Sequence, residues 1–166
     1  MIIFDFDLTL VNTQPVEKLR AERKWKEVMA QAGKLEVYPG ISELLKELVI
    51  ENQTLAIVTS SPDMIPRYFI RQYEWPVDIV LGYHQVSRKK PDPEGLYLAM
   101  EKAGASPENT FHIGDQPEDT QASKAANVTA IGAGWGLADT LSLEESAPDY
   151  FFASVAELRE FLLKTT

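Results

Sequence analysis

The chain has 166 residues, of which 45% are hydrophobic and 25% are charged, and its formal net charge is −9. This length predicts one domain with a sizeable core, and the acidic charge argues against nucleic acid or an anionic membrane surface as a partner. The sequence has no cysteine and no apolar run of about 18 residues that could span a membrane, so we expect a cytoplasmic protein.

The first strand is predicted at residues 1–4, which are apolar and β-prone. Asp5 and Asp7 follow at its C-terminal end and would point to the same side, because strand side chains alternate. Unpaired charge is costly beside a buried strand, and ligands bind at this end of the strands in open α/β sheets. We therefore interpret the pair as chemical residues; the alternative is that they are turn residues that end a strand.

Helices and strands are predicted to alternate along the rest of the chain. Thr13 is expected to cap a helix that has Pro15 in its first turn, and the apolar spacing from Trp25 predicts one amphipathic helix that ends at Gly33. Further helices are expected around residues 41–48, 67–73, 93–103, 117–126 and 155–163, and further strands at 54–59, 78–81, 110–114, 128–131 and 150–152. This order predicts an α/β, three-layer Rossmann-like fold with a central parallel sheet of five or more strands.

Polar side chains follow three of the predicted strands. Asp5 and Asp7 follow the first, Thr59 and Ser60 the second, and Asp115 the fourth. In a right-handed doubly wound sheet these strand ends share one edge, where carboxylates would repel by about 4 kcal/mol per close pair at an effective dielectric near 20. A divalent cation relieves that repulsion, and hard oxygen ligands favour Mg²⁺, which usually takes its remaining ligands from water and phosphate.

Four motifs, in the expected order, resemble those of the haloacid dehalogenase-like hydrolase superfamily. They are Asp5-Phe6-Asp7-Leu8-Thr9 for DxDxT, Ile57-Val58-Thr59-Ser60 for a strand that ends in Thr or Ser, Lys90-Pro91 for a lysine before proline, and Gly114-Asp115-Gln116-Pro117-Glu118-Asp119 for GDxxxD. Tyr38-Pro39-Gly40 and Trp135-Gly136 resemble the phosphoglycolate phosphatase-like branch in particular. The resemblance spans nearly the whole chain.

The resemblance implies a Mg²⁺-dependent phosphatase that hydrolyses a phosphomonoester through an aspartyl-phosphate intermediate. It implies that Asp5 is the nucleophile and that Asp7 protonates the leaving oxygen and then deprotonates the attacking water. The implied metal ligands are Asp5, Asp7 and Asp115, with Asp7 acting through its backbone carbonyl.

The resemblance also implies a phosphate-binding set made of Thr59, Ser60 and Lys90. Asp119 would orient water or Lys90 without binding the metal directly. Alternatives stay open: Thr59 could be a plain helix N-cap, Lys89 could replace Lys90, and Asp119 could be a favourable first-turn acid. The basic run Arg88-Lys89-Lys90 is too short for a nucleic-acid patch but suits a local anion site.

We expect a single domain, residues 1–166, with a core at 1–12 and 37–166 and a reduced helical cap at 13–36. Relatives in this branch insert several helices there, whereas 13–36 allows one long helix or a short hairpin. So small a lid cannot cover a pocket, which points to a phosphorylated small molecule or a larger phosphorylated substrate, with water excluded by the substrate or by a partner chain of an oligomer. Leu8 stands where the family most often has Gly, Asp or Ser, so the turn there is expected to differ.

Other functions remain as alternatives. A phosphomutase of the same superfamily would also need Asp7, but it must keep water out. A dehalogenase would need Asp5 but neither Asp7 nor a metal. A non-catalytic phospho-acceptor like a response-regulator receiver also combines acids, Thr and Lys, but its acceptor follows the acidic pair by a strand-helix-strand interval. A regulatory protein that has lost its activity is the remaining alternative.

Overall fold

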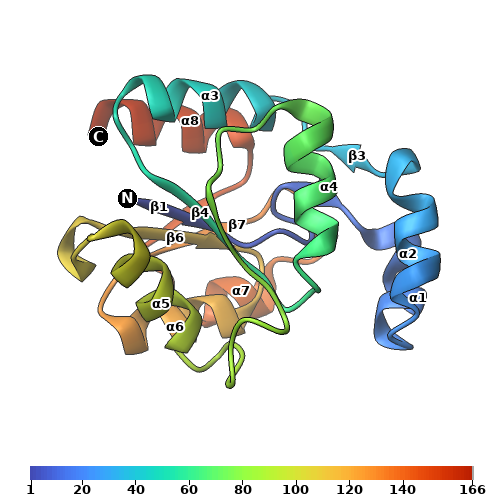
Figure 1. The fold of residues 1–166 in the computed structure, drawn as a ribbon. Coiled ribbons are helices and arrows are strands. Elements are labelled where there is room, and N and C mark those ends of the chain that lie inside the picture. The colour runs from blue at the N-terminus through green and yellow to red at the C-terminus, as the bar shows by residue number, and fades with distance from the viewer. Residues whose placement is uncertain (166) are drawn as a thin grey trace.

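A computed structural model describes residues 1–165 of the chain, and its centre is a six-stranded parallel sheet (Figure 1). From one edge to the other the strands are β5 (Ile79–Leu81), β4 (Leu55–Val58), β1 (Ile2–Phe4), β6 (Phe111–Gly114), β7 (Thr129–Ala133) and β8 (Tyr150–Phe152). Every neighbouring pair is parallel.

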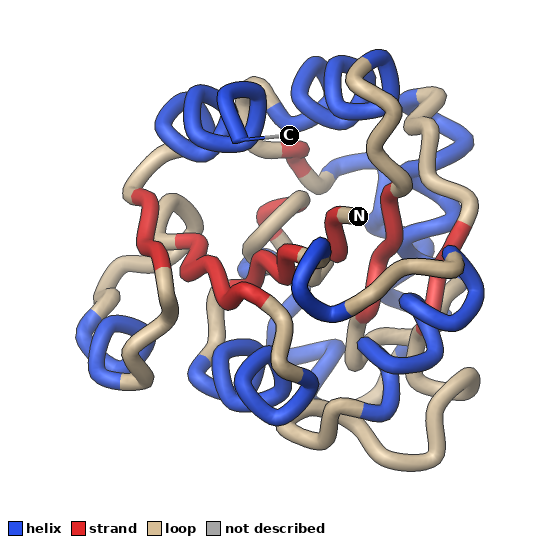
Figure 2. Tube along the Cα trace, turned by 90° about the vertical axis from the view of Figure 1, so that its left-hand side faces the viewer, coloured by secondary structure: helices blue, strands red, loops and turns tan. Residues whose placement is uncertain are grey.

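Helices cover both faces of the sheet and complete three layers, as the two views in Figures 1 and 2 show. One face carries α3 (Ile41–Ile50), α4 (Met64–Tyr73) and α8 (Val155–Thr165). The other carries α5 (Glu94–Ala103) and α6 (Pro117–Ala126), with the short α7 (Leu141–Glu145) against α6. The predicted α/β fold with a parallel sheet and helices on both faces is confirmed.

The first strand is buried on both of its faces. Ile2 and Phe4 pack in the larger core cluster under α3, α4 and α8, whereas Ile3 packs in the smaller cluster with α5 and α6. All three side chains are fully buried, and burying a side chain of this size contributes about 1.5–3 kcal/mol. The central position of β1 therefore follows from its unbroken apolar sequence.

The parallel register brings three strand ends to one edge of the sheet. Phe4, the last residue of β1, lies opposite Ile57 of β4 and Ile113 of β6. Residues that follow these strands, which include Asp5, Thr59 and Asp115, therefore emerge side by side.

The segment between β1 and α3 is small and irregular. It holds β2 (Val11–Asn12), a 3₁₀ turn at Gln14–Val16, α1 (Glu17–Ala21), α2 (Trp25–Gln31), a 3₁₀ turn at Ala32–Lys34 and β3 (Glu36–Val37), which pairs antiparallel with β2. The helix expected to run from Trp25 to Gly33 is α-helical only as far as Gln31, and a 3₁₀ turn follows. Thr13 occupies the predicted N-cap position, before the 3₁₀ turn that contains Pro15, but its hydroxyl makes no capping hydrogen bond and instead accepts a 3.3 Å hydrogen bond from Arg20.

Across residues 1–165, none of the helices combines the length and the apolar character that crossing a membrane requires.

Candidate active site

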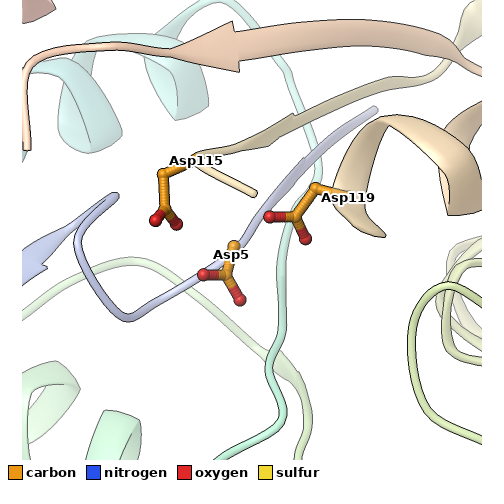
Figure 3. A group of neighbouring side chains, drawn as sticks. All are labelled: Asp5, Asp115 and Asp119. Atoms are coloured by element: carbon orange, nitrogen blue, oxygen red, sulfur yellow. The ribbon is translucent and has the colours of Figure 1, made fainter. Parts of the chain in front are cut away.

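Three carboxylates from separate elements meet at the carboxyl edge of the sheet. Asp5 follows β1, Asp115 follows β6, and Asp119 lies in the first turn of α6. One carboxylate oxygen from each lies within 4.8 Å of the others, and all three residues are buried. Figure 3 shows the three carboxylates gathered around one small space.

Lys90 supplies a cation to two of these carboxylates. Its Nζ lies 2.6 Å from Asp5 Oδ1 and 2.5 Å from Asp119 Oδ1, and it donates a 3.1 Å hydrogen bond to the carbonyl of Val58. The neighbouring Lys89 is placed differently, with its Nζ 3.2 Å from the centre of the Tyr83 ring. Of the two adjacent lysines, Lys90 is therefore the one that reaches the carboxylates.

Burial and mutual repulsion raise the pKa of two of these carboxylates, Asp5 and Asp115. Burial raises the pKa of Asp5 well above its usual value, and Asp119 and Asp115 add to the rise while Lys90 opposes it. Burial also raises the pKa of Asp115 to about 6, with a further contribution from Asp119. By contrast, Lys90 and the backbone amide of Gln116 help to hold the pKa of Asp119 below its usual value, against the effect of burial.

Asp115 is held by neutral groups only. Its Oδ1 accepts a 3.2 Å hydrogen bond from the Thr9 hydroxyl, and its Oδ2 accepts a 2.5 Å hydrogen bond from the Gln116 side-chain amide. No ion pair joins Asp115 to a cation anywhere in residues 1–165. Asp115 is therefore the carboxylate of this group with the most capacity to bind a metal ion.

Asp119 has a structural task as well as a place beside Lys90. Its Oδ2 accepts a 3.0 Å hydrogen bond from the backbone amide of Gln116, and the two residues form a capping box at the start of α6. A β-carbon on Gly114 would lie 2.3 Å from Asp119 Cγ, so the absent side chain at residue 114 is what leaves room for this carboxylate. The first-turn role that the sequence allowed for Asp119 and its contact with Lys90 thus occur together.

Asp7 lies apart from the three carboxylates, in a cradle of hydrogen-bond donors. Its Oδ2 accepts hydrogen bonds from the hydroxyls of Thr59 at 3.3 Å and Ser61 at 2.8 Å, and it forms an ion pair with Arg20 Nη2 at 2.8 Å. Its Oδ1 is buried and has no hydrogen-bond partner among the described residues. Asp7 therefore keeps one oxygen available for a proton or for a bound molecule.

The hydroxyl groups that follow β4 make different contacts. The Thr59 hydroxyl donates to Asp7 and accepts the backbone amide of Ser61, and the N-cap position of α4 belongs to Asp63 instead. Ser60 is exposed and lines the cavity. Thr59 thus touches Asp7 and does not cap a helix.

Sequence reasoning did not identify Arg20 and Ser61 as site residues. Ser61 belongs to the visible run Thr59-Ser60-Ser61, so its hydroxyl could have been included. Arg20 matches no motif, and nothing in the sequence indicated that α1 would bring it to Asp7.

The site opens into a cavity of about 390 Å³ between the sheet edge and α1. Within it four buried carboxylates face two cations, and the residues concerned are Asp5, Asp7, Asp115, Asp119, Arg20 and Lys90. A divalent cation would balance this difference. The carboxylate, hydroxyl and amide groups nearest Asp115 offer oxygen and nitrogen atoms and no sulfur. The carboxylate oxygens of Asp5 and Asp115 are the hard ligands that suit Mg²⁺.

Known proteins resemble the chain over most of its length. The sequence model of the family described as "Haloacid dehalogenase-like hydrolase" matches residues 16–133. A phosphoglycolate phosphatase of Pseudomonas putida is 29% identical over 118 residues, which cover 68% of this chain and 42% of the relative. The pyrophosphatase PpaX of Oceanobacillus iheyensis is 29% identical over 131 residues, which cover 73% of this chain and 58% of the relative. The chain thus spans about half the length of these curated relatives.

A solved structure shares the fold. The crystal structure of a hydrolase from Pseudomonas syringae superimposes with a TM-score of 0.84 at 22% identity, and the match covers 99% of this chain and 98% of that one. At this identity the likeness concerns the fold alone. With a family match over more than half of its residues, the chain belongs to the haloacid dehalogenase-like hydrolase family.

Proposed function

We propose that this chain is a Mg²⁺-dependent phosphatase that hydrolyses a phosphomonoester through an aspartyl-phosphate on Asp5. The observation that carries the proposal is the convergence of three buried carboxylates, with Lys90 between two of them, beside a cavity. Relatives of this family named as a phosphoglycolate phosphatase and a pyrophosphatase support the same class of reaction.

In the proposed first step, a carboxylate oxygen of Asp5 attacks phosphorus, a P–O bond forms, and the bond from phosphorus to the leaving oxygen breaks. Asp7 gives its proton to that leaving oxygen, which departs as an alcohol. In the second step Asp7 takes a proton from water, the water oxygen attacks phosphorus, and inorganic phosphate leaves with Asp5 restored. The partnerless Oδ1 of Asp7 suits this exchange of a proton.

The remaining residues would position the phosphoryl group and balance its charge. Lys90 would stabilise the negative charge of Asp5 and of the transferring group, and Asp119 would hold Lys90 in place. Thr59 and the exposed Ser60 would contribute neutral donors. Mg²⁺, held by Asp115, Asp5 and the backbone carbonyl of Asp7, would add charge stabilisation to phosphate oxygens.

We further propose that residues 13–36 are a reduced cap on a single-domain core formed by residues 1–12 and 37–166. In support, this stretch holds α1, α2, short turns and only the first residue of β3, and α1 contributes Glu17 and Arg20 to the cavity wall. A cap of this size leaves the cavity accessible to a phosphorylated small molecule or to a phosphate on a larger substrate.

Hydrolysis of p-nitrophenyl phosphate tests the proposal. We expect turnover with Mg²⁺, its loss in EDTA and its return when Mg²⁺ is restored. Asp5→Asn should lower kcat by at least about 10³-fold because it removes the nucleophile, and Asp7→Asn by about 10²–10⁴-fold. Asp78→Asn, which changes an exposed aspartate that makes no side-chain hydrogen bond or ion pair within residues 1–165, is the matched control and should keep full activity.

The same assay separates the alternatives. A phospho-acceptor would take up one phosphoryl group per chain and stop, and a phosphomutase would release little inorganic phosphate. Full activity in EDTA, or in Asp5→Asn, would show that the proposed chemistry is wrong.

A further inference from the structure

A second cleft, of about 350 Å³, adjoins the active-site cavity. It lies between α1 and α2 on one side and the loops after β4 and β5 on the other. Glu17, Arg20 and Ser60 line both spaces, so a molecule with its phosphate in the cavity could extend into the cleft.

Two cations reach the cleft from opposite sides and meet at one aromatic ring. Lys89 Nζ lies 3.2 Å from the centre of the Tyr83 ring, and the guanidinium carbon of Arg23 lies 5.6 Å from the same centre. Arg23 Nη1 is also 3.5 Å from the Tyr83 hydroxyl. The cleft thus joins the cap segment to the core through a basic and aromatic contact.

The backbone at Arg23 holds this arrangement at a cost. Arg23 separates α1 from α2 and has a φ of 55°, in the left-handed region, which costs a residue other than glycine roughly 1–2 kcal/mol. Strained positions of this kind cluster at functional sites. The turn at Arg23 bends the cap segment so that this side chain reaches Tyr83.

Neither of these two cations has an acidic partner in the part of the chain that the structure describes. This is notable in a protein with 25 acidic and 16 basic side chains, and the adjacent Arg88 pairs with both Asp92 and Glu94. Glu17 is the one carboxylate among the lining residues, and Arg20, the third lining cation, is already paired with Asp7. The cleft is therefore a locally basic space in an acidic protein.

We propose that this cleft binds a second anionic group, a carboxylate or a phosphate, carried by the leaving group of the substrate. The inference rests on the proposed phosphatase function, because it assigns the cleft to the part of the substrate beyond the scissile phosphate. Lys89 and Arg23 supply the countercharge, and Tyr83 fixes the position of both. The same two cations hold the pKa of Tyr83 below its ordinary value, as expected where the local potential is positive.

Binding of stable phosphonates, measured by isothermal titration calorimetry in Mg²⁺ buffer, tests this proposal without any turnover. Phosphonoacetate, 3-phosphonopropionate and 4-phosphonobutyrate vary the reach of a carboxylate, and each is compared with the alkylphosphonate of the same chain length. Methylenediphosphonate places a second phosphonate there instead. We expect at least one ligand with a second anionic group to bind about 5-fold to 10-fold more tightly than the alkylphosphonate of the same length, because two partly exposed ion pairs each contribute a modest amount.

Lys89→Gln, Arg23→Gln and the double variant test whether these two residues cause the tighter binding of ligands with a second anionic group. The preference should shrink in each single variant, fall below about 2-fold in the double variant, and weaken in wild type as salt is raised, since exposed charges are screened. Lys102→Gln removes the same charge from an exposed lysine on α5 and should keep the full preference. Because the single variants alter one surface side chain each, they carry the test even where the double variant unfolds.

Equal binding of phosphonates with and without the second anionic group at every length, or a preference that survives in the variants, would overturn the assignment of the cleft. Failure of the phosphatase proposal has a different outcome, namely no Mg²⁺-dependent hydrolysis of p-nitrophenyl phosphate. The two results are therefore read from separate experiments.

Discussion

Lys90 lies between two buried carboxylates and is itself almost entirely enclosed, with its side chain 9% exposed. Asp119 and Asp5 outweigh burial and raise the pKa of Lys90 above its ordinary value, so the ammonium stays charged. Removing one member of a buried ion-pair network leaves charge without compensation, which is far more costly than removing the whole network.

We therefore expect Lys90→Met to lower the free energy of unfolding by about 3–5 kcal/mol. Urea unfolding in EDTA at neutral pH measures this loss. Lys102→Met, on the exposed surface of α5, is the matched control and should change stability by no more than about 0.5 kcal/mol. A Lys90→Met protein within about 1 kcal/mol of wild type would mean that the carboxylates are neutralised in another way.

The single-residue outcomes show what the sequence could and could not predict about the site. Asp5, Thr59 and Asp115 could be placed at one edge because each directly follows a buried strand, and strand ends share an edge in a parallel sheet. The proline at residue 91 favours Lys90 over Lys89, but the path of the loop, which the sequence does not show, decides which ammonium reaches the carboxylates. Arg20 could not be predicted, because its place beside Asp7 depends on how the cap segment packs.

At the scale of elements, the loop after β1 is held by a second loop, the one after β7. Leu8 has a φ of 59°, so the departure from the usual Gly, Asp or Ser at this position leaves a branched residue in the left-handed region. The indole nitrogen of Trp135 donates a 2.9 Å hydrogen bond to the carbonyl of Thr9. A β-carbon on Gly136 would lie 2.2 Å from the carbonyl oxygen of Leu8 and 2.6 Å from the Tyr38 hydroxyl.

Gly136→Ala should accordingly destabilise the protein by roughly 1–3 kcal/mol, because the carbonyl that it meets is backbone and cannot rotate away. Thermal unfolding measures the effect, and p-nitrophenyl phosphate hydrolysis should fall as well, since the displaced loop carries Asp7. Gly33→Ala is the control: the nearest atom there is the end of the Tyr68 side chain, at 3.1 Å, which moves more readily than a backbone carbonyl. Equal stability of the two variants would count against a close fit between the two loops.

Elements differed in how well the sequence predicted them. The helix expected at 117–126 is found as α6, with its proline at the first position and its capping box, both strong local signals. α7 and the β2–β3 pair were not predicted, because five-residue and two-residue elements are too short to show a period. The break between α1 and α2 has no glycine or proline to mark it, because Arg23 itself adopts the left-handed conformation.

On the scale of the whole molecule, the site collects residues that lie far apart in the chain. Asp5 and Asp115 are brought together by the pairing of β1 with β6, and Lys90 arrives from the loop before α5. An unfolded chain has no such cluster, so an ion that binds here stabilises the native state in proportion to its affinity.

Mg²⁺ should therefore raise the unfolding temperature. At a hundredfold excess over its dissociation constant the stabilisation is about 2.7 kcal/mol, which corresponds to roughly 5–10 °C for a chain of this length. Differential scanning calorimetry in Mg²⁺ and in EDTA measures the difference.

Asp115→Asn should raise the stability of the protein in EDTA while removing most of the stabilisation by Mg²⁺. Folding raises the pKa of Asp115 to about 6, so at pH 7.5 its ionised form lowers native stability in EDTA, by about 1–3 kcal/mol. The asparagine variant lacks that charge and should be more stable than wild type in EDTA, yet gain little from Mg²⁺. Asp78→Asn, at an exposed position, should behave as wild type in both buffers. If Mg²⁺ stabilised Asp115→Asn as much as wild type, the ion would have to bind somewhere other than among these carboxylates.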